Sequence, residues 1–341
     1  MNPTEQLLGM IPSPFAKNKF EENRNRRELE SAYVCAVKNK MALLFLGKLI
    51  ERQPLSMWKQ TCQNELARYE KTLTTIAATS SLLSKGKIEH AIFKTVRPYD
   101  SATVDIDIII FGNHSDYVKS VRLLETAGYS YLGNGPQSTT LWDKSVKIGI
   151  DLYDEIAVSY AIYMDKNTLR QSIVNHTLES GDEIRILNPE ADLACIIAHS
   201  VIKEQMYTLS EYYSFVQYLK KIDAERFLKL VKLNNISSAV SCHASLTAFL
   251  HQKYHGPIPQ TLQMILSELG QNTLEPERLS ENDFGTPHKY HLLTFARSLL
   301  EIAKSSKTRK SIAHQAFKLS DPRFSKQFSR LVMEHVLRET Y

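Results

Sequence analysis

The sequence predicts an α+β protein in which a small mixed β-sheet follows a helical lead and precedes a helical C-terminal domain. Three observations support this prediction. Apolar residues recur at three-and-four spacing up to residue 86, short β-branched runs follow between residues 88 and 187, and nearly every later segment fits a helix. We therefore expect a helical lead over 1–86, an α/β domain over 87–188 and a helical domain over 189–341.

The lead is expected to begin with a loose polar arm over residues 1–26. One helix should follow over residues 29–50, because its apolar positions keep a helical period until Pro54 interrupts the chain. A second helix is expected over residues 56–83, ending close to Gly86.

The period then changes to that of strands. Residues 88–95 and 103–111 predict the first two strands, after which Gly112, Asn113 and Ser115 stop the strand and cap a helix that ends at Gly128. Further strands are expected at residues 129–132, at 138–143, around Asp151 and at 183–187.

The C-terminal region begins with clear helix punctuation. Asn188 and Pro189 favour a helix start, and the helix that follows should reach about residue 205. Later helices are expected at residues 208–221, 223–233, 237–253, 259–269, 289–304 and 308–338, with a break at Asp321 and Pro322.

The composition narrows the class of protein. A chain of 341 residues with 43% hydrophobic content can bury a large core. No segment reaches the roughly 18 apolar residues of a membrane span, so we expect no membrane association. The four cysteines are far apart and form no CxxC pair, which favours reduced thiols and a cytoplasmic location. The net charge of +5 is too small to establish a polyanionic partner.

The segment TVDIDIIIF contains the main chemical signal. Asp105 and Asp107 lie two positions apart on an apolar strand, so both carboxylates point to the face opposite Ile106 and Ile108. Charges beside a buried strand are costly unless they are compensated, and magnesium prefers such hard oxygen ligands. A DxD pair also occurs as solvated charges in loops and edge strands, so the pair alone leaves both interpretations open.

Two neighbouring features favour the metal site. Asp151 lies in a second apolar strand, where it would share a face with Gly149 and could supply a third carboxylate. Lys94 and Arg97 lie just upstream of the acidic strand, and both cations suit phosphate. The alternative for these two cations is an ordinary solvated turn.

Several short stretches together resemble a known family. They are FK at 93–94, RPYD at 97–100, VDIDIII at 104–110, AGY at 127–129, IDLYDEI at 150–156 and PEADLACIIAHSVIKE at 189–204. Over about residues 90–205 the chain resembles an uncharacterised nucleotidyltransferase group of the DNA polymerase β-like superfamily.

The resemblance implies a nucleoside triphosphate donor and two magnesium ions held by Asp105, Asp107 and Asp151. It also matches Lys94 to the lysine of the phosphate-binding turn. The group usually has glycine after this lysine, whereas this chain has Thr95, and no GS dipeptide precedes the acidic strand. Since glycine lets backbone amides approach phosphate closely, the phosphate site here would depend on side chains instead. The expected nucleotide-binding residues are Lys94, Thr95, Arg97, His199 and Lys203.

His199 has two interpretations. The family helix carries a histidine at a comparable place, which favours a base or a phosphate contact, with Lys203 one turn later. A histidine on an amphipathic helix is also commonly a satisfied or solvent-facing side chain.

The positive charge is concentrated at the end of the chain. Residues 289–341 carry eleven Lys and Arg against four Asp and Glu, a net +7. This asymmetry favours RNA as a partner, although a solvated helix face is an equally good explanation.

Two functions follow from these patterns. The first is a magnesium-dependent nucleotidyltransferase acting on a hydroxyl of an RNA end, a protein or a small molecule. The second is a non-catalytic nucleotide- or RNA-binding protein on the same fold, which the missing glycine favours.

Overall fold

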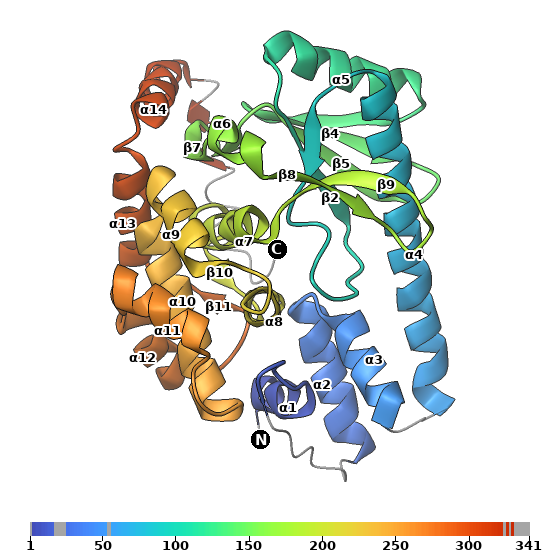
Figure 1. Ribbon diagram of the computed structural model, residues 1–341, viewed down its shortest axis with the longest axis vertical. Helices are drawn as coiled ribbons and strands as arrows, with labels where there is room; N and C mark the ends of the chain where they lie inside the picture. The colour runs from blue at the N-terminus through green and yellow to red at the C-terminus, as the bar shows by residue number, and fades with distance from the viewer. Residues whose placement is uncertain (1, 17–24, 53–55, 323–324, 327–328, 331–341) are drawn as a thin grey trace.

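The computed structural model describes residues 2–16, 25–52, 56–322, 325–326 and 329–330. A seven-stranded mixed sheet in the order β3-β4-β5-β2-β1-β9-β8 forms its centre, and helices surround it (Figure 1). The predicted α+β class is confirmed. No helix among these residues has the length and apolarity needed to cross a lipid bilayer.

The centre of the sheet combines parallel and antiparallel pairing. Strand β2 (Asp105–Ile110) is parallel to β5 (Ile148–Tyr153) and antiparallel to β1 (His90–Ile92), and β1 is parallel to β9 (Glu183–Leu187). The other strands of the sheet are β3 (Ser130–Asn134), β4 (Ser138–Asp143) and β8 (Ile173–Thr177). Two small ribbons pair β6 (Ile156–Val158) with β7 (Ala161–Met164) and β10 (Met206–Tyr207) with β11 (His288–Lys289).

The two faces of β2 enter different apolar clusters. Ile106, Ile108 and Ile110 pack with residues of α4 (Ser56–Lys85) and α5 (His114–Thr126). Ile109, on the other face, belongs to a second cluster that contains the N-terminal and C-terminal helices. Because strand side chains alternate, Asp105 and Asp107 point toward this second side, as the sequence predicted.

The second face of the sheet is covered by α7 (Pro189–Ala198), which continues into a π-helical turn, η2 (His199–Glu204). Figure 1 shows α9 to α14 to the left of α7, and α1 to α3 at the lower end of the molecule. The proposed division at residues 86 and 188 stays a prediction. The remaining helices are α6 (Lys166–Leu169), η1 (Arg170–Ser172), α8 (Leu209–Tyr218), α9 (Ala224–Leu233), α10 (Ser237–Tyr254), α11 (Gln260–Leu269), α12 (Leu274–Glu281), α13 (Leu292–Ile302) and α14 (Ser306–Lys318).

The loose arm expected over residues 1–26 is wrong for its first part. Helix α1 (Pro3–Met10) begins at an Asn2 cap, whose side chain accepts the N–H of Thr4 at 2.8 Å. Leu7 and Leu8 are fully buried in the second cluster. The signal was present, since asparagine followed by proline favours a helix start, but the segment is too short for its period to stand out.

The single helix expected over residues 29–50 is also wrong. Two helices, α2 (Arg26–Lys38) and α3 (Ala42–Arg52), are separated by a turn in which Lys40 has a left-handed φ of 57°. The buried Asn39 amide occupies this break, donating to the Cys35 carbonyl at 2.9 Å and accepting the Leu209 N–H at 2.9 Å. The contact with Leu209 is distant in sequence, so the helical period alone could not reveal it.

The C-terminal half of the sheet region holds more strands than expected. The β6–β7 ribbon and the edge strand β8 were not expected. The signal of β8 is weak because the strand is mostly exposed and its sequence, IVNHT, is largely polar. Helix α12 was also missed. The expected elements β4, β9, α4, α5 and α7 are present.

We expect Leu8→Ala to lower the free energy of unfolding by about 2–5 kcal/mol, because it empties a buried leucine site. The midpoint of urea unfolding measures this change. Val34→Ala is the control, since 55% of Val34 is exposed and its truncation should shift stability by about 0.5 kcal/mol or less. Equal, small effects for both variants would mean that α1 does not pack on the core.

Candidate active site

Strands β2 and β5 bring three carboxylates to one face of the sheet. Asp107 is the direct partner of Asp151 in the parallel register, and Asp105 lies two residues earlier on β2. Asp107 is only 7% exposed, and the Thr140 hydroxyl donates to Asp151 Oδ1 at 2.6 Å. The sequence prediction that these three residues share one face agrees with this arrangement.

The turn after β1 is held in place by buried side chains. Lys94 has a left-handed φ of 60°, which is uncommon for a residue other than glycine. Its N–H donates to Asp192 Oδ1 at 2.6 Å, and the Tyr218 hydroxyl donates to Asp192 Oδ2 at 2.7 Å. The Thr95 hydroxyl accepts the N–H of Asp107 at 2.9 Å. Thr95 therefore ties this turn to β2, at the position where the resembling group has glycine.

This turn directs the Lys94 side chain at the acidic strand. Lys94 Nζ lies 3.0 Å from Asp107 Oδ1 and 3.0 Å from His199 Nδ1. Lys203, from the π-helical turn, donates to the Tyr153 hydroxyl at 3.2 Å. The structure thus brings Lys94, His199 and Lys203 to the same side of the sheet as Asp107.

The pKa values of the three carboxyls diverge. Burial, reinforced by the negative charge of Asp107, raises the pKa of Asp151 to about 6 and also raises that of Asp105. Burial acts against ionisation of Asp107 as well, but the positive charges of Lys94 and Lys203 and the hydrogen bond from Lys94 together outweigh it, so the pKa of Asp107 lies below its ordinary value. Asp107 is therefore the most readily ionised of the three.

The histidine on the next helix is electrically neutral. Burial, with the nearby charges of Lys94 and Lys203, lowers the pKa of His199 to about 3. Its Nε2 lies 3.1 Å from Glu204 Oε1, and the Tyr163 hydroxyl lies 3.1 Å from its Nδ1. Both ring nitrogens are thus engaged within the protein.

The residue types at this face fit magnesium. Magnesium takes hard oxygen ligands, usually one or two carboxylates together with water and substrate phosphates. Burial and the negative charge of Asp107 raise the pKa values of both Asp105 and Asp151, so a further cation beside them would stabilise their ionised forms. Within the described ranges, however, no three His, Cys, Asp or Glu side chains are grouped closely enough to hold a metal ion between them. The fit is therefore to an ion that shares its coordination with substrate and water.

A polar cavity of about 450 Å³ opens over Asp105 and Asp107. Its size is within the range of small-molecule sites. Asp151, one strand further along, is not part of its wall. The predicted residues that line it are Lys94, Thr95, Arg97, Asp105, Asp107, His199 and Lys203.

Arg97 lines this cavity but is directed toward α8. Its guanidinium donates to the Ser214 hydroxyl at 3.1 Å and lies 3.9 Å from Glu211 Oε1. To contact phosphate as the sequence predicts, the Arg97 guanidinium would have to bind the phosphate in addition to Ser214 and Glu211.

Sequence reasoning missed four residues that shape the site. Asp192 anchors the Lys94 turn, and Glu204 contacts His199. Lys40 and Arg68, from the helical lead, line the cavity, and the pKa of the buried Lys40 ammonium is lowered by burial despite the nearby Glu211 and Asp105. Asp192 and Glu204 lie inside the resembling segment and could have been examined there, whereas no pattern connected Lys40 to the sheet.

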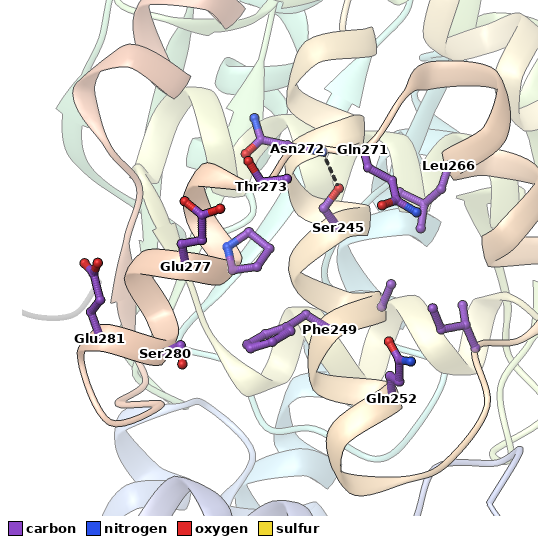
Figure 2. A pocket seen from close by; sticks show the side chains of 13 residues that line it. Ser245, Phe249, Gln252, Leu266, Gln271, Asn272, Thr273, Glu277, Ser280 and Glu281 are labelled. Carbon is purple, nitrogen blue, oxygen red and sulfur yellow. Dashed lines mark hydrogen bonds between the residues drawn. The ribbon is translucent and has the colours of Figure 1, made fainter.

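A larger cavity of about 610 Å³ lies elsewhere, among α10, α11 and α12 (Figure 2). Phe249, Leu266 and Pro276 form its apolar part, and Ser245 accepts the N–H of Asn272 at 2.9 Å at its side. None of the predicted site residues lines it. We therefore place the candidate active site at the smaller cavity, because its wall carries the carboxylates and cations that the sequence singled out.

The chain matches no protein-family model and shows no significant match to a curated protein. Two solved structures are similar to it at low level. One is an antigenic nucleotidyltransferase-like protein from Paracoccidioides brasiliensis, with 13% identity, a TM-score of 0.33 and coverage of 67% of this chain and 97% of that one. The other is the STING-associated CdnE c-di-GMP synthase from Capnocytophaga granulosa, with 14% identity, a TM-score of 0.28 and coverage of 76% and 89%. At these scores the similarities carry no argument, and the case for a function depends on the site.

Asp151→Asn should stabilise the metal-free protein at neutral pH. The pKa of Asp151 is higher in the fold than in the unfolded chain, so stability from this group is complete only below about pH 4 and is lost as the pH rises through about 6. The cost of the ionised form is about 3 kcal/mol at most, at 1.36 kcal/mol per pKa unit. Asparagine removes this cost while keeping an oxygen for the Thr140 hydroxyl.

Urea unfolding in a chelator, at pH values from about 4 to 8, measures this effect. The difference between Asp151→Asn and the wild type should be small at the acid end and should grow in favour of the variant up to about pH 7. The exposed Asp182 provides a control, since Asp182→Asn should show no such growth. A difference that does not change with pH would contradict the burial of an ionisable Asp151.

Proposed function

We propose that this protein is a magnesium-dependent nucleotidyltransferase that moves a nucleoside monophosphate from a nucleoside triphosphate to an acceptor hydroxyl. The observation that supports it best is the placement of Asp105, Asp107 and Asp151 on one face of β2 and β5, next to a cavity lined by Lys94 and Arg97. The carboxylates that could bind metal and the cations that could bind phosphate therefore lie next to each other at this cavity.

Asp105 and Asp107 would hold the magnesium ions, with Asp151 as a third ligand on the acceptor side. Bound magnesium would activate the acceptor oxygen and stabilise the negative charge that develops on the phosphates. Lys94 and Arg97 would contact the β- and γ-phosphates, since an ammonium and a guanidinium both bind such oxygens well. Thr95, His199 and Lys203 complete the proposed nucleotide site.

The transfer would form one bond and break one. The acceptor hydroxyl oxygen attacks the α-phosphorus as the bond from that phosphorus to pyrophosphate breaks. The proton of the hydroxyl would pass to the carboxylate of Asp151, which lies beside Asp107 on the neighbouring strand. The products are the nucleotidylated acceptor and pyrophosphate.

We expect Asp105→Asn and Asp107→Asn each to lower magnesium-dependent transfer by about a hundredfold or more, because each removes a negative ligand where the reaction needs charge. The assay incubates the purified protein with each α-labelled nucleoside triphosphate in turn, magnesium and a cell extract, and follows label in RNA, protein and small molecules. Circular dichroism checks that the fold is kept.

Asp182→Asn is the matched control and should keep the wild-type rate. If either β2 variant keeps wild-type turnover at saturating magnesium, the proposed mechanism is lost. A wild type that binds nucleotide but transfers no label to any fraction would support the alternative, a non-catalytic nucleotide- or RNA-binding protein.

We further propose RNA as the acceptor, presented by the basic C-terminal helices. The cations of residues 289–341 support this proposal, but Lys307 is already engaged in ion pairs within the protein. Lys307 Nζ lies 2.9 Å from Glu155 Oε2 and 2.7 Å from Asp165 Oδ1, so it helps to attach α14 to the rest of the protein. Lys304, Arg309 and Lys310 are exposed and are better placed to meet a polyanion.

Charge reversal of Lys304, Arg309 and Lys310 together should flatten the salt dependence of RNA binding. Each phosphate contact to single-stranded RNA contributes a slope of about 0.7 in log K against log salt through counterion release. Fluorescence anisotropy with a labelled oligonucleotide at several salt concentrations gives the slope. An unchanged slope, or no affinity of the wild type at low salt, would favour a protein or small-molecule hydroxyl.

A further inference from the structure

The Lys94 ammonium has a second partner besides the acidic strand. It lies 3.0 Å from Asp107 Oδ1 on one side and 3.0 Å from His199 Nδ1 on the other. His199 Nε2 lies in turn 3.1 Å from Glu204 Oε1. A continuous line of polar contacts therefore runs from the carboxylate of β2, through Lys94 and His199, to Glu204.

The chemistry of the two ends decides where the imidazole proton lies. A lysine ammonium only donates hydrogen bonds, so the His199 Nδ1 that faces it must be the acceptor. The carboxylate of Glu204 accepts, so the proton of the neutral ring lies on Nε2. The other tautomer would place an N–H against the Lys94 ammonium and a lone pair against the carboxylate.

The local winding of the helix makes this pairing possible. His199 and Glu204 are five residues apart, and in an α-helix such residues point roughly 140° away from each other. The turn from His199 to Glu204 is π-helical, and π winding places residues five apart on the same side. Gln205 then ends the turn with a left-handed φ of 54°. The π-helical winding therefore brings the His199 and Glu204 side chains into contact.

We infer that Glu204 and His199 are positioning residues that hold the Lys94 ammonium toward the polyphosphate of the donor. Glu204 fixes the tautomer of His199, and the Nδ1 lone pair of His199 fixes the direction of Lys94. This inference rests on the proposed function, because it assigns the polyphosphate to Lys94. It also makes His199 neither a general base nor a direct phosphate ligand.

The test uses inorganic tripolyphosphate with magnesium, which carries no nucleotidyl group and therefore reports binding alone. Isothermal titration of the full chain measures the affinity, and Lys94→Met should weaken it by about 10–100-fold, the value of a charge-assisted hydrogen bond. Glu204→Ala and His199→Gln should each weaken it by about tenfold, as for groups that orient a ligand.

Two conservative variants separate positioning from packing and from charge. The side-chain oxygen of asparagine reaches the place of Nδ1, so His199→Asn should bind within about twofold of the wild type, whereas the longer His199→Gln should not. Glu204→Gln keeps an acceptor for Nε2 and should also bind nearly normally. Glu225→Ala, an exposed carboxylate distant from this line in sequence, is the control.

The possible failures differ from one another. No tripolyphosphate binding by the wild type, or none that depends on Lys94, would overturn the proposed function together with this inference. Wild-type binding that Lys94→Met weakens but that Glu204→Ala and His199→Gln leave unchanged would overturn this inference alone. Equal losses in Glu204→Gln and Glu204→Ala would assign Glu204 a role through its charge instead. If Glu204→Ala does not fold, the two His199 variants decide.

Discussion

The ion pair between Lys94 and Asp107 is the interaction on which the site depends. Asp107 is almost fully buried, and its neighbours Asp105 and Asp151 add negative charge on the same face. A buried carboxylate without a partner would be costly, and the ammonium at 3.0 Å provides that partner. The central strand β2 positions the Asp107 carboxylate, and the turn after β1 positions the Lys94 ammonium.

The surrounding structure holds that turn in an unfavourable backbone conformation. Two contacts hold Lys94 at its left-handed φ. Asp192, at the start of α7, accepts the Lys94 N–H, and the next residue, Thr95, accepts the N–H of Asp107 on β2. Helix α7 thus contributes twice, with Asp192 at its beginning and His199 after its end. An apolar helix packed against the sheet can fix both groups, since its residues 191–198 are buried in the core.

Much of this arrangement follows from local sequence. The alternation in TVDIDIIIF fixes the face of Asp105 and Asp107, and the apolar strand around Asp151 predicts its partner. The neighbouring positions of β2 and β5 agree with that prediction. The α+β class followed in the same way, from a change of period that is visible without any tertiary contact.

Other features depend on contacts that a local pattern does not contain. Lys40 reaches the cavity because Asn39 breaks the lead helix, and Asn39 does so by bonding to Leu209, far along the chain. The π winding after α7 has no signature in a helical period. The contact of His199 with Lys94 joins residues that are 105 positions apart. Such contacts are set by packing between elements, which sequence periodicity does not describe.

The proposed function requires that a divalent metal bind where Lys94 now faces the β2 carboxylates. Anomalous diffraction from crystals soaked with manganese and a nucleoside triphosphate tests this requirement most directly, since manganese accepts the same oxygen ligands as magnesium. We predict anomalous density in contact with Asp105 and Asp107, with Lys94 Nζ moved from Asp107 toward the polyphosphate. Bound triphosphate with no metal at these carboxylates, or Lys94 still paired with Asp107 beside it, would contradict the account.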